Sequence, residues 1–140
     1  MKILFITFIN PPYFLPDSIL NLGHEIKAGP HFRDVRDSEG NWTSMALPSG
    51  AFDLSLALRS KSNFSRPDLI IIHVDATFHC LPSNLPSEIP CISFVGDTHH
   101  LRHPLTRMLK YLQGESFCAH FVWNRQHVSM MRKMGLKSSH

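Results

Sequence analysis

Four short runs of apolar residues, separated by longer polar or amphipathic stretches, constrain the fold of this chain most strongly. They occupy residues 3–9, 69–74, 91–95 and 118–123. Three of the four are continuously apolar rather than alternating, which is typical of strands that are covered on both faces of a parallel sheet. A weaker strand is expected at residues 24–28.

Helical periodicity appears between the expected strands, and residues that favour helix ends flank it. Along the first helix, Leu15, Ile19 and Leu22 share one face, and in the second Phe52, Leu56 and Arg59 do so. The expected helices are residues 15–22 ending at Gly23, residues 51–59 capped by Ser49, residues 104–112 capped by His103, and residues 124–134 capped by Asn124 and ending at Gly135.

This alternation predicts one α/β domain over residues 1–140. We expect a Rossmann-like, doubly wound fold with a mostly parallel sheet of about five or six strands and helices on both faces. Residues 29–50 form a long polar stretch and are expected to be a loop, and residues 76–88 are expected to be a surface connection.

Composition excludes several classes of protein. The three cysteines have no C-x-x-C spacing, so neither a disulfide framework nor a thiolate zinc site is expected, and a reducing, cytoplasmic setting fits best. Cys91 and Cys118 lie in apolar runs and are expected to be small buried hydrophobic residues. No run approaches the ~20 apolar residues that a membrane span requires.

The charge is unevenly distributed. Residues 100–140 hold seven of the 14 Lys and Arg residues but only one of the 11 Asp and Glu residues, Glu115. We interpret this basic third as the solvated face of two helices. No nucleic-acid partner is expected, because no Lys/Arg run interleaved with aromatic residues accompanies the charge.

The turn after residues 91–95 concentrates the chemistry of the chain. It carries Asp97, His99, His100 and His103 ahead of a predicted helix. Open α/β sheets bind ligands at such turns, outside the carboxyl ends of their strands. A carboxylate and an imidazole there could act as a general base and as the group that orients it, so Asp97 and His99 are the candidate catalytic residues.

His73 and Asp75 end the neighbouring predicted strand, so they are expected near the same turn. His79 follows four residues after Asp75, and together such side chains could bind zinc, manganese or iron. We predict no metal, because no spacing matches a known zinc motif and ten histidines in 140 residues make accidental clusters common.

Two further residues are candidates for contact with a substrate. Asn10 follows the first predicted strand, in a loop that lacks the glycine-rich pattern of dinucleotide-binding proteins. It could therefore line a substrate pocket rather than a dinucleotide site. Arg125, near the start of the last predicted helix, could neutralise a phosphate on a substrate.

Two sets of segments resemble known glycosyltransferases. Residues 19–26, Ile-Leu-Asn-Leu-Gly-His-Glu-Ile, resemble the LxxLGHEV passage of GT-B glycosyltransferases. The series of residues 67–73, 90–100 and 117–127 resembles the N-terminal half of bacterial GT-B enzymes of the CgeB-like, spore-maturation group, and Gly-Asp-Thr-His-His at 96–100 is its most specific passage. Cys118 departs from this pattern, since many relatives have Asp there.

The resemblance implies the acceptor-side domain of an enzyme that moves a sugar from a nucleotide-sugar donor to a hydroxyl acceptor. Donor binding would require a second Rossmann-like domain, which this chain is expected to lack, so no transfer is expected from the chain alone. No cofactor is implied. The residues expected to face the interdomain cleft are Asp97 and His99 as catalytic groups, and Asn10, His73, Asp75, His100 and Arg125 as acceptor contacts.

Two other function classes remain open on the sequence. One is a small metal-binding α/β hydrolase or isomerase that uses the His/Asp cluster. The other is a non-catalytic interaction module, which would self-associate or bind a partner through the open face of the cleft.

Overall fold

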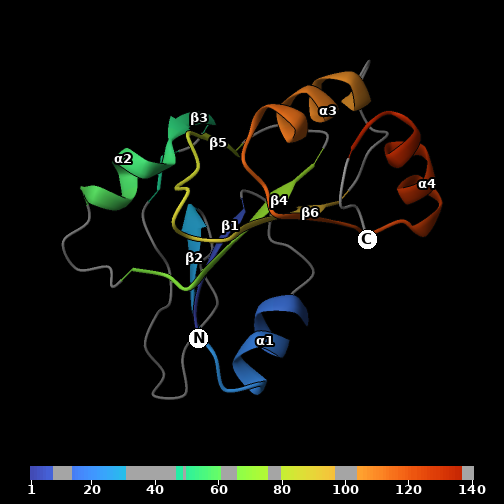
Figure 1. Cartoon of the computed structure of the whole chain (residues 1–140). Coiled ribbons are helices and arrows are strands. Elements are labelled where there is room, and N and C mark those ends of the chain that lie inside the picture. The colour runs from blue at the N-terminus through green and yellow to red at the C-terminus, as the bar shows by residue number, and fades with distance from the viewer. Residues whose placement is uncertain are drawn as a thin grey trace.

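A computed structural model describes residues 1–7, 14–30, 47–48, 50–60, 66–75, 80–96 and 104–136 of the chain. Helices are interleaved with strands along it (Figure 1). In chain order the elements are β1 (Lys2–Thr7), α1 (Phe14–Asn21), β2 (Glu25–Pro30), β3 (Gly50–Asp53), α2 (Leu54–Arg59), β4 (Leu69–Val74), β5 (Cys80–Ser83), β6 (Cys91–Val95), α3 (Pro104–Gly114), β7 (Ala119–Val122) and α4 (Arg125–Lys133).

The main sheet has five strands in the order β2-β1-β4-β6-β7, and every neighbouring pair is parallel. This confirms the predicted α/β class and the parallel sheet. From β1 the chain first adds β2 on one side and then returns to add β4 on the other. The strand order therefore reverses between β1 and β4, which makes this pair the topological switch point of the sheet.

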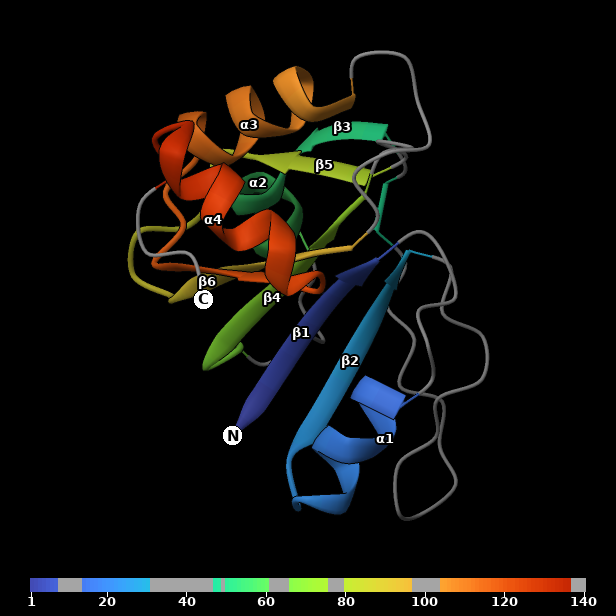
Figure 2. The same cartoon turned by 90° about the vertical axis from the view of Figure 1, so that its right-hand side faces the viewer.

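Helices cover the sheet from both sides (Figure 2). On one face, Ile19 of α1 packs against a buried cluster that includes Ile3, Phe5 and Ile71. On the opposite face, α2, α3 and α4 pack over the larger core, whose fully buried side chains include Leu4, Ile6, Ile70, Ile72, Met108, Leu112 and Met131. Alternate residues of β1 thus point into different cores, as the continuous apolar run predicted.

A second, two-stranded parallel sheet corrects two predictions. β3 pairs with β5, with Gly50 opposite Cys80 and Asp53 opposite Ser83. Residues 51–59 are therefore not one helix, and residues 76–88 are not simply a surface connection. The helix begins only at α2, capped by Asp53, whose carboxylate accepts a hydrogen bond from the Leu56 amide at 2.7 Å.

The other helix ends agree largely with the sequence. Gly23 and Gly135 have φ angles of +74° and +91°, the left-handed conformation that glycine adopts at helix ends. The Asn124 side chain accepts a hydrogen bond from the Gln126 amide at 3.0 Å and caps α4. Leu22, expected on the buried face of the first helix, is 73% exposed because α1 ends one residue earlier. His103 and Ser49 lie outside the described residues.

The cysteines differ from one another in exposure. Cys80 and Cys91 are buried, and burial raises the pKa of each thiol to about 12, so both stay protonated at neutral pH. Cys118 is exposed, which contradicts the expected burial, because β7 begins only at the next residue. Within the described part of the chain, no helix is long and apolar enough to cross a membrane.

Candidate functional site

The candidate site begins with two side chains at the switch point of the sheet. Thr7 is the last residue of β1, and His73 is the second-last residue of β4. The Thr7 Oγ1 atom lies 3.1 Å from His73 Nδ1, within hydrogen-bonding distance. The contact joins the carboxyl ends of two neighbouring parallel strands, which is where open α/β sheets bind their ligands.

The next strand along the sheet positions the imidazole of His73 further. The Phe94 ring of β6 packs against it, with ring centroids 5.8 Å apart and planes inclined by 49°. Gly96 follows β6 and donates its amide hydrogen to the Val74 carbonyl at 2.9 Å. A Cβ atom on Gly96 would lie 2.5 Å from His73 Nε2, so only glycine leaves room for the imidazole in this position.

An aromatic row extends from His73 along the carboxyl edge of the sheet; we use this name for His73, Phe94 and Trp123. Phe94 meets Trp123 in an edge-to-face contact with ring centroids 6.0 Å apart. Trp123 follows β7, and its amide donates to the Val95 carbonyl at 2.9 Å. The indole is 60% exposed, so the row ends in an aromatic surface that is accessible to solvent. Such a surface can stack against a planar group or the apolar face of a sugar.

Electrostatics favour a neutral imidazole at the site. Burial lowers the pKa of His73 below its ordinary value, and the nearby Asp75 carboxylate opposes that shift. A neutral histidine has one ring nitrogen that donates a hydrogen bond and one that accepts. With Nδ1 engaged at Thr7, Nε2 is the atom that lies beside Gly96.

The structure places three of the predicted site residues at this edge. His73 lies within the site, and Asp75 follows β4 closely enough for its charge to influence His73. Arg125 is the exposed first residue of α4, beyond β7, at the far end of the aromatic row. The other four predicted site residues lie outside the described residues; they are Asn10, Asp97, His99 and His100.

A metal centre gains no support from the part of the chain that the structure covers. Among the described residues, no group of three or more His, Cys, Asp or Glu side chains could hold a metal ion. His79 lies outside these residues, as do Asp97, His99 and His100.

Sequence reasoning missed Thr7, Phe94, Gly96 and Trp123. A signal existed for Thr7, because it is a polar residue within the first apolar run. It could be paired with His73 only once the strand order was known, since that order makes β1 and β4 neighbours.

A second polar pair lies beneath the helices rather than at the edge. Ser93 Oγ is 2.8 Å from His120 Nδ1, and the two side chains are 0% and 5% exposed. Burial lowers the pKa of His120. Because the pair faces the core under α3 and α4, we interpret it as a satisfied structural contact between β6 and β7.

No protein-family model matches this chain, and neither a curated protein nor a solved structure is significantly similar to it. The fold defines a Rossmann-like α/β protein, and the switch-point pair with the aromatic row defines its candidate ligand site. The evidence for a function is therefore this geometry together with the sequence passages that contain the residues of the site.

Proposed function

We propose that this chain is the N-terminal, acceptor-side domain of a GT-B glycosyltransferase of the CgeB-like group, and that it binds a hydroxyl acceptor at the carboxyl edge of its sheet. The observation that carries this proposal is the Thr7–His73 contact at the switch point, with the imidazole fitted against Gly96. This contact holds a neutral imidazole at the carboxyl ends of the strands, where open α/β sheets bind ligands.

The positions of the resembling segments support the proposal. Residues 19–26 run from the end of α1 into β2 through Gly23, whose φ of +74° provides the turn that the LxxLGHEV passage requires. The three other segments include most of β4 and all of β6 and β7, which are adjacent in the sheet. The Gly-Asp-Thr-His-His passage begins at Gly96, the residue against which His73 packs.

Glycosyl transfer requires removal of the acceptor proton while the acceptor oxygen bonds to the anomeric carbon of the donor sugar. The bond from that carbon to the nucleoside diphosphate breaks, and the leaving group departs with its electron pair. In this proposal Asp97 and His99 supply the base and the group that orients it, and His73, fixed by Thr7, orients the acceptor hydroxyl. The aromatic row contacts the apolar face of a sugar acceptor.

Donor binding in this proposal belongs to a second Rossmann-like domain, as the resemblance implies. The prediction for the isolated chain is therefore binding of an acceptor without turnover. His73 and Arg125 would contact the acceptor, Arg125 through any phosphate that it carries.

A glycan array, probed with the fluorescently labelled chain, tests acceptor binding. We expect the chain to bind a restricted set of carbohydrates, and His73→Ala to weaken that binding by about tenfold or more. His24→Ala is the matched control, because His24 lies at the opposite end of the sheet, just before β2. Absence of binding to any carbohydrate, or equal binding by wild type and His73→Ala, would reject the proposal.

A further inference from the structure

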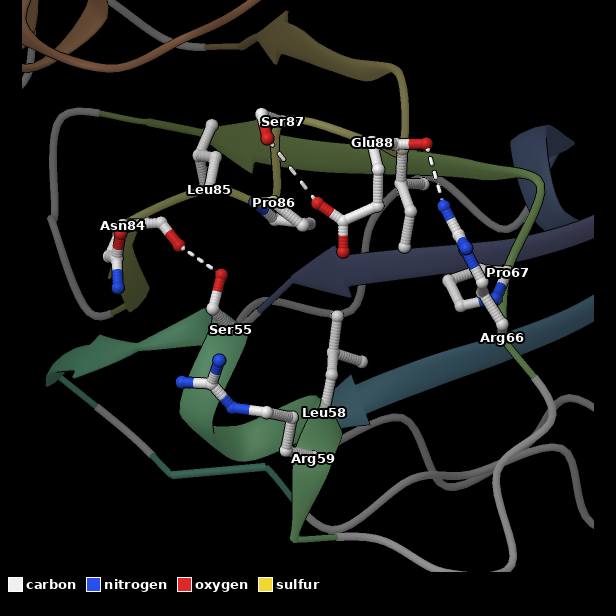
Figure 3. Close-up of a pocket in the computed structure, with 11 residues that line it drawn as sticks. Ser55, Leu58, Arg59, Arg66, Pro67, Asn84, Leu85, Pro86, Ser87 and Glu88 are labelled. Carbon is white, nitrogen blue, oxygen red and sulfur yellow. Dashed lines mark hydrogen bonds between the residues drawn. The ribbon is translucent and has the colours of Figure 1, made fainter.

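A cavity lies at the other end of the strands, near the amino ends of β4 and β6 (Figure 3). Its volume is about 420 Å³, within the range of small-molecule sites. Three segments line it: α2, the residues that lead into β4, and residues 84–89 between β5 and β6. The polar lining includes Ser55, Arg59, Arg66, Asn84, Ser87 and Glu88.

Three charged side chains line this cavity without neutralising one another. Within the described part of the chain, neither arginine forms an ion pair with Glu88. Arg59 makes no hydrogen bond there, but its charge adds to the Leu56 and Asn84 hydrogen bonds that lower the pKa of Asp53. Among the described residues, the Glu88 carboxylate accepts one hydrogen bond, a long one of 3.4 Å from the Ser87 hydroxyl. In the view of Figure 3, the Glu88 side chain lies between the two arginines.

Other contacts fix the framework of the cavity. Arg66 Nη2 donates to the Glu88 carbonyl oxygen at 2.9 Å and ties the two walls together. Asn84 has a left-handed φ of +53°. Its side-chain amide donates to the Asp53 carboxylate at 2.8 Å, and its backbone carbonyl accepts from the Ser55 hydroxyl at 2.8 Å. The buried side chains of Leu85 and Ile89 line the apolar part. The charged groups are therefore carried on a preorganised frame.

We propose that this cavity binds a phosphorylated sugar or a similar phosphorylated polyol. Arg59, on the same side of the cavity as Ser55 in Figure 3, is the partner for the phosphate, because a guanidinium presents several donors that match phosphate oxygens. Glu88 accepts hydrogen bonds from the hydroxyl groups, since an ionised carboxylate is purely an acceptor. Arg66 adds positive charge, and its guanidinium has further N–H groups besides the one that donates to the Glu88 carbonyl.

The cavity is separate from the candidate acceptor site. Arg66 and Pro67 precede β4, whereas His73 lies near its other end. A strand of this length separates the two edges by roughly 15–20 Å. Ligand binding here is therefore independent of the proposed glycosyltransferase function, and either proposal can fail without the other.

Isothermal titration calorimetry with glucose 6-phosphate tests this proposal, with glucose and inorganic phosphate as comparison probes. We expect wild type to bind glucose 6-phosphate more tightly than either comparison probe. Arg59→Gln, which removes the charge and disturbs no hydrogen bond of the described residues, should weaken this binding about tenfold. Glu88→Gln should reduce the preference over inorganic phosphate. Lys110→Ala removes an exposed charge of α3, outside the cavity, and should leave binding unchanged.

Three results would overturn the proposal. The first is no measurable binding of glucose 6-phosphate at about 10 mM, a concentration that reveals even weak sites. The second is an equal loss of affinity in Arg59→Gln and Lys110→Ala, which would indicate nonspecific attraction to positive charge. The third is inorganic phosphate binding as tightly as glucose 6-phosphate, which would contradict recognition of the polyol.

Discussion

Thr7 and His73 are separated by 66 residues in the sequence, yet Thr7 Oγ1 lies 3.1 Å from His73 Nδ1 at the carboxyl ends of β1 and β4. Thr7 is 1% exposed, so its hydroxyl is shielded from water. The same contact should therefore stabilise the pairing of β1 with β4 and fix the orientation of the imidazole that we place in the acceptor site.

Replacement of Thr7 by valine tests this link, because valine keeps the shape and removes the hydroxyl. We expect Thr7→Val to lower the free energy of unfolding by about 1 kcal/mol, the usual net worth of one hydrogen bond. Urea denaturation measures that loss, and NMR of the His73 ring nitrogens reports the broken contact. Thr7→Ser retains the hydroxyl and should keep the ring-nitrogen shifts of wild type. Unchanged shifts in Thr7→Val would contradict the link.

Gly96→Ala tests the fit of the imidazole. The new Cβ would lie 2.5 Å from His73 Nε2, so the ring must move away from Thr7 or the backbone must shift. We expect a loss of about 1–3 kcal/mol, the usual range for overpacking, in urea denaturation. Gly114→Ala is the matched control: no atom lies within 4 Å of its added Cβ, and its φ is not left-handed, so stability should stay the same or increase. Equal behaviour of the two variants would show that His73 does not occupy the space beside Gly96.

Stability should decrease on mild acidification. Burial lowers the pKa of both His73 and His120 below the ordinary value of 6.5. As the pH falls through that value, the unfolded chain binds protons that the folded chain does not bind. The free energy of unfolding should therefore be fully retained above about pH 7 and fall below about pH 6.5. Thermal melts followed by circular dichroism at several pH values measure this dependence. His73→Gln should reduce it, and an identical dependence in that variant would remove His73 as a cause.

Ser93→Ala should destabilise the sheet between β6 and β7. It leaves His120 Nδ1 without its partner at 2.8 Å in a region where both side chains are almost fully buried. An unsatisfied buried polar atom costs about 1–3 kcal/mol. Ser129→Ala, on the exposed face of α4, is the control and should change stability little. Differential scanning calorimetry compares the two, and equal melting temperatures would contradict a structural role for the Ser93–His120 pair.

The main sheet and most helix ends followed from the sequence because their signals are local. Continuous apolar runs indicated parallel strands, and Gly23, Asn124 and Gly135 marked helix ends through their own backbone preferences or hydrogen bonds. The small sheet did not follow, because Gly50 pairs with Cys80 across thirty positions of chain and neither strand has a distinctive pattern alone. The prediction of one helix over residues 51–59 was wrong for the same reason, because residues 51–53 belong to β3.

The sequence could indicate only those residues of the candidate site that lie at the end of a recognisable strand. His73 lies near the end of an obvious strand and Asp75 directly follows it, so their place at the carboxyl edge could be inferred. Thr7 and Gly96 acquire their roles through strand order and close packing against one imidazole, and no local pattern contains that information. The roles assigned to Asp97 and His99 remain predictions from the sequence.

The most direct test of acceptor binding at the Thr7–His73 site is an NMR titration of the isotopically labelled chain with a carbohydrate selected on the glycan array. Binding at the switch point predicts that the His73 ring nitrogens, the Gly96 amide and the Trp123 indole shift together and saturate with one dissociation constant, while Arg59 and Arg66 do not shift. Saturable shifts that are confined to other surfaces, with His73 and Gly96 unchanged, would contradict an acceptor site at this edge.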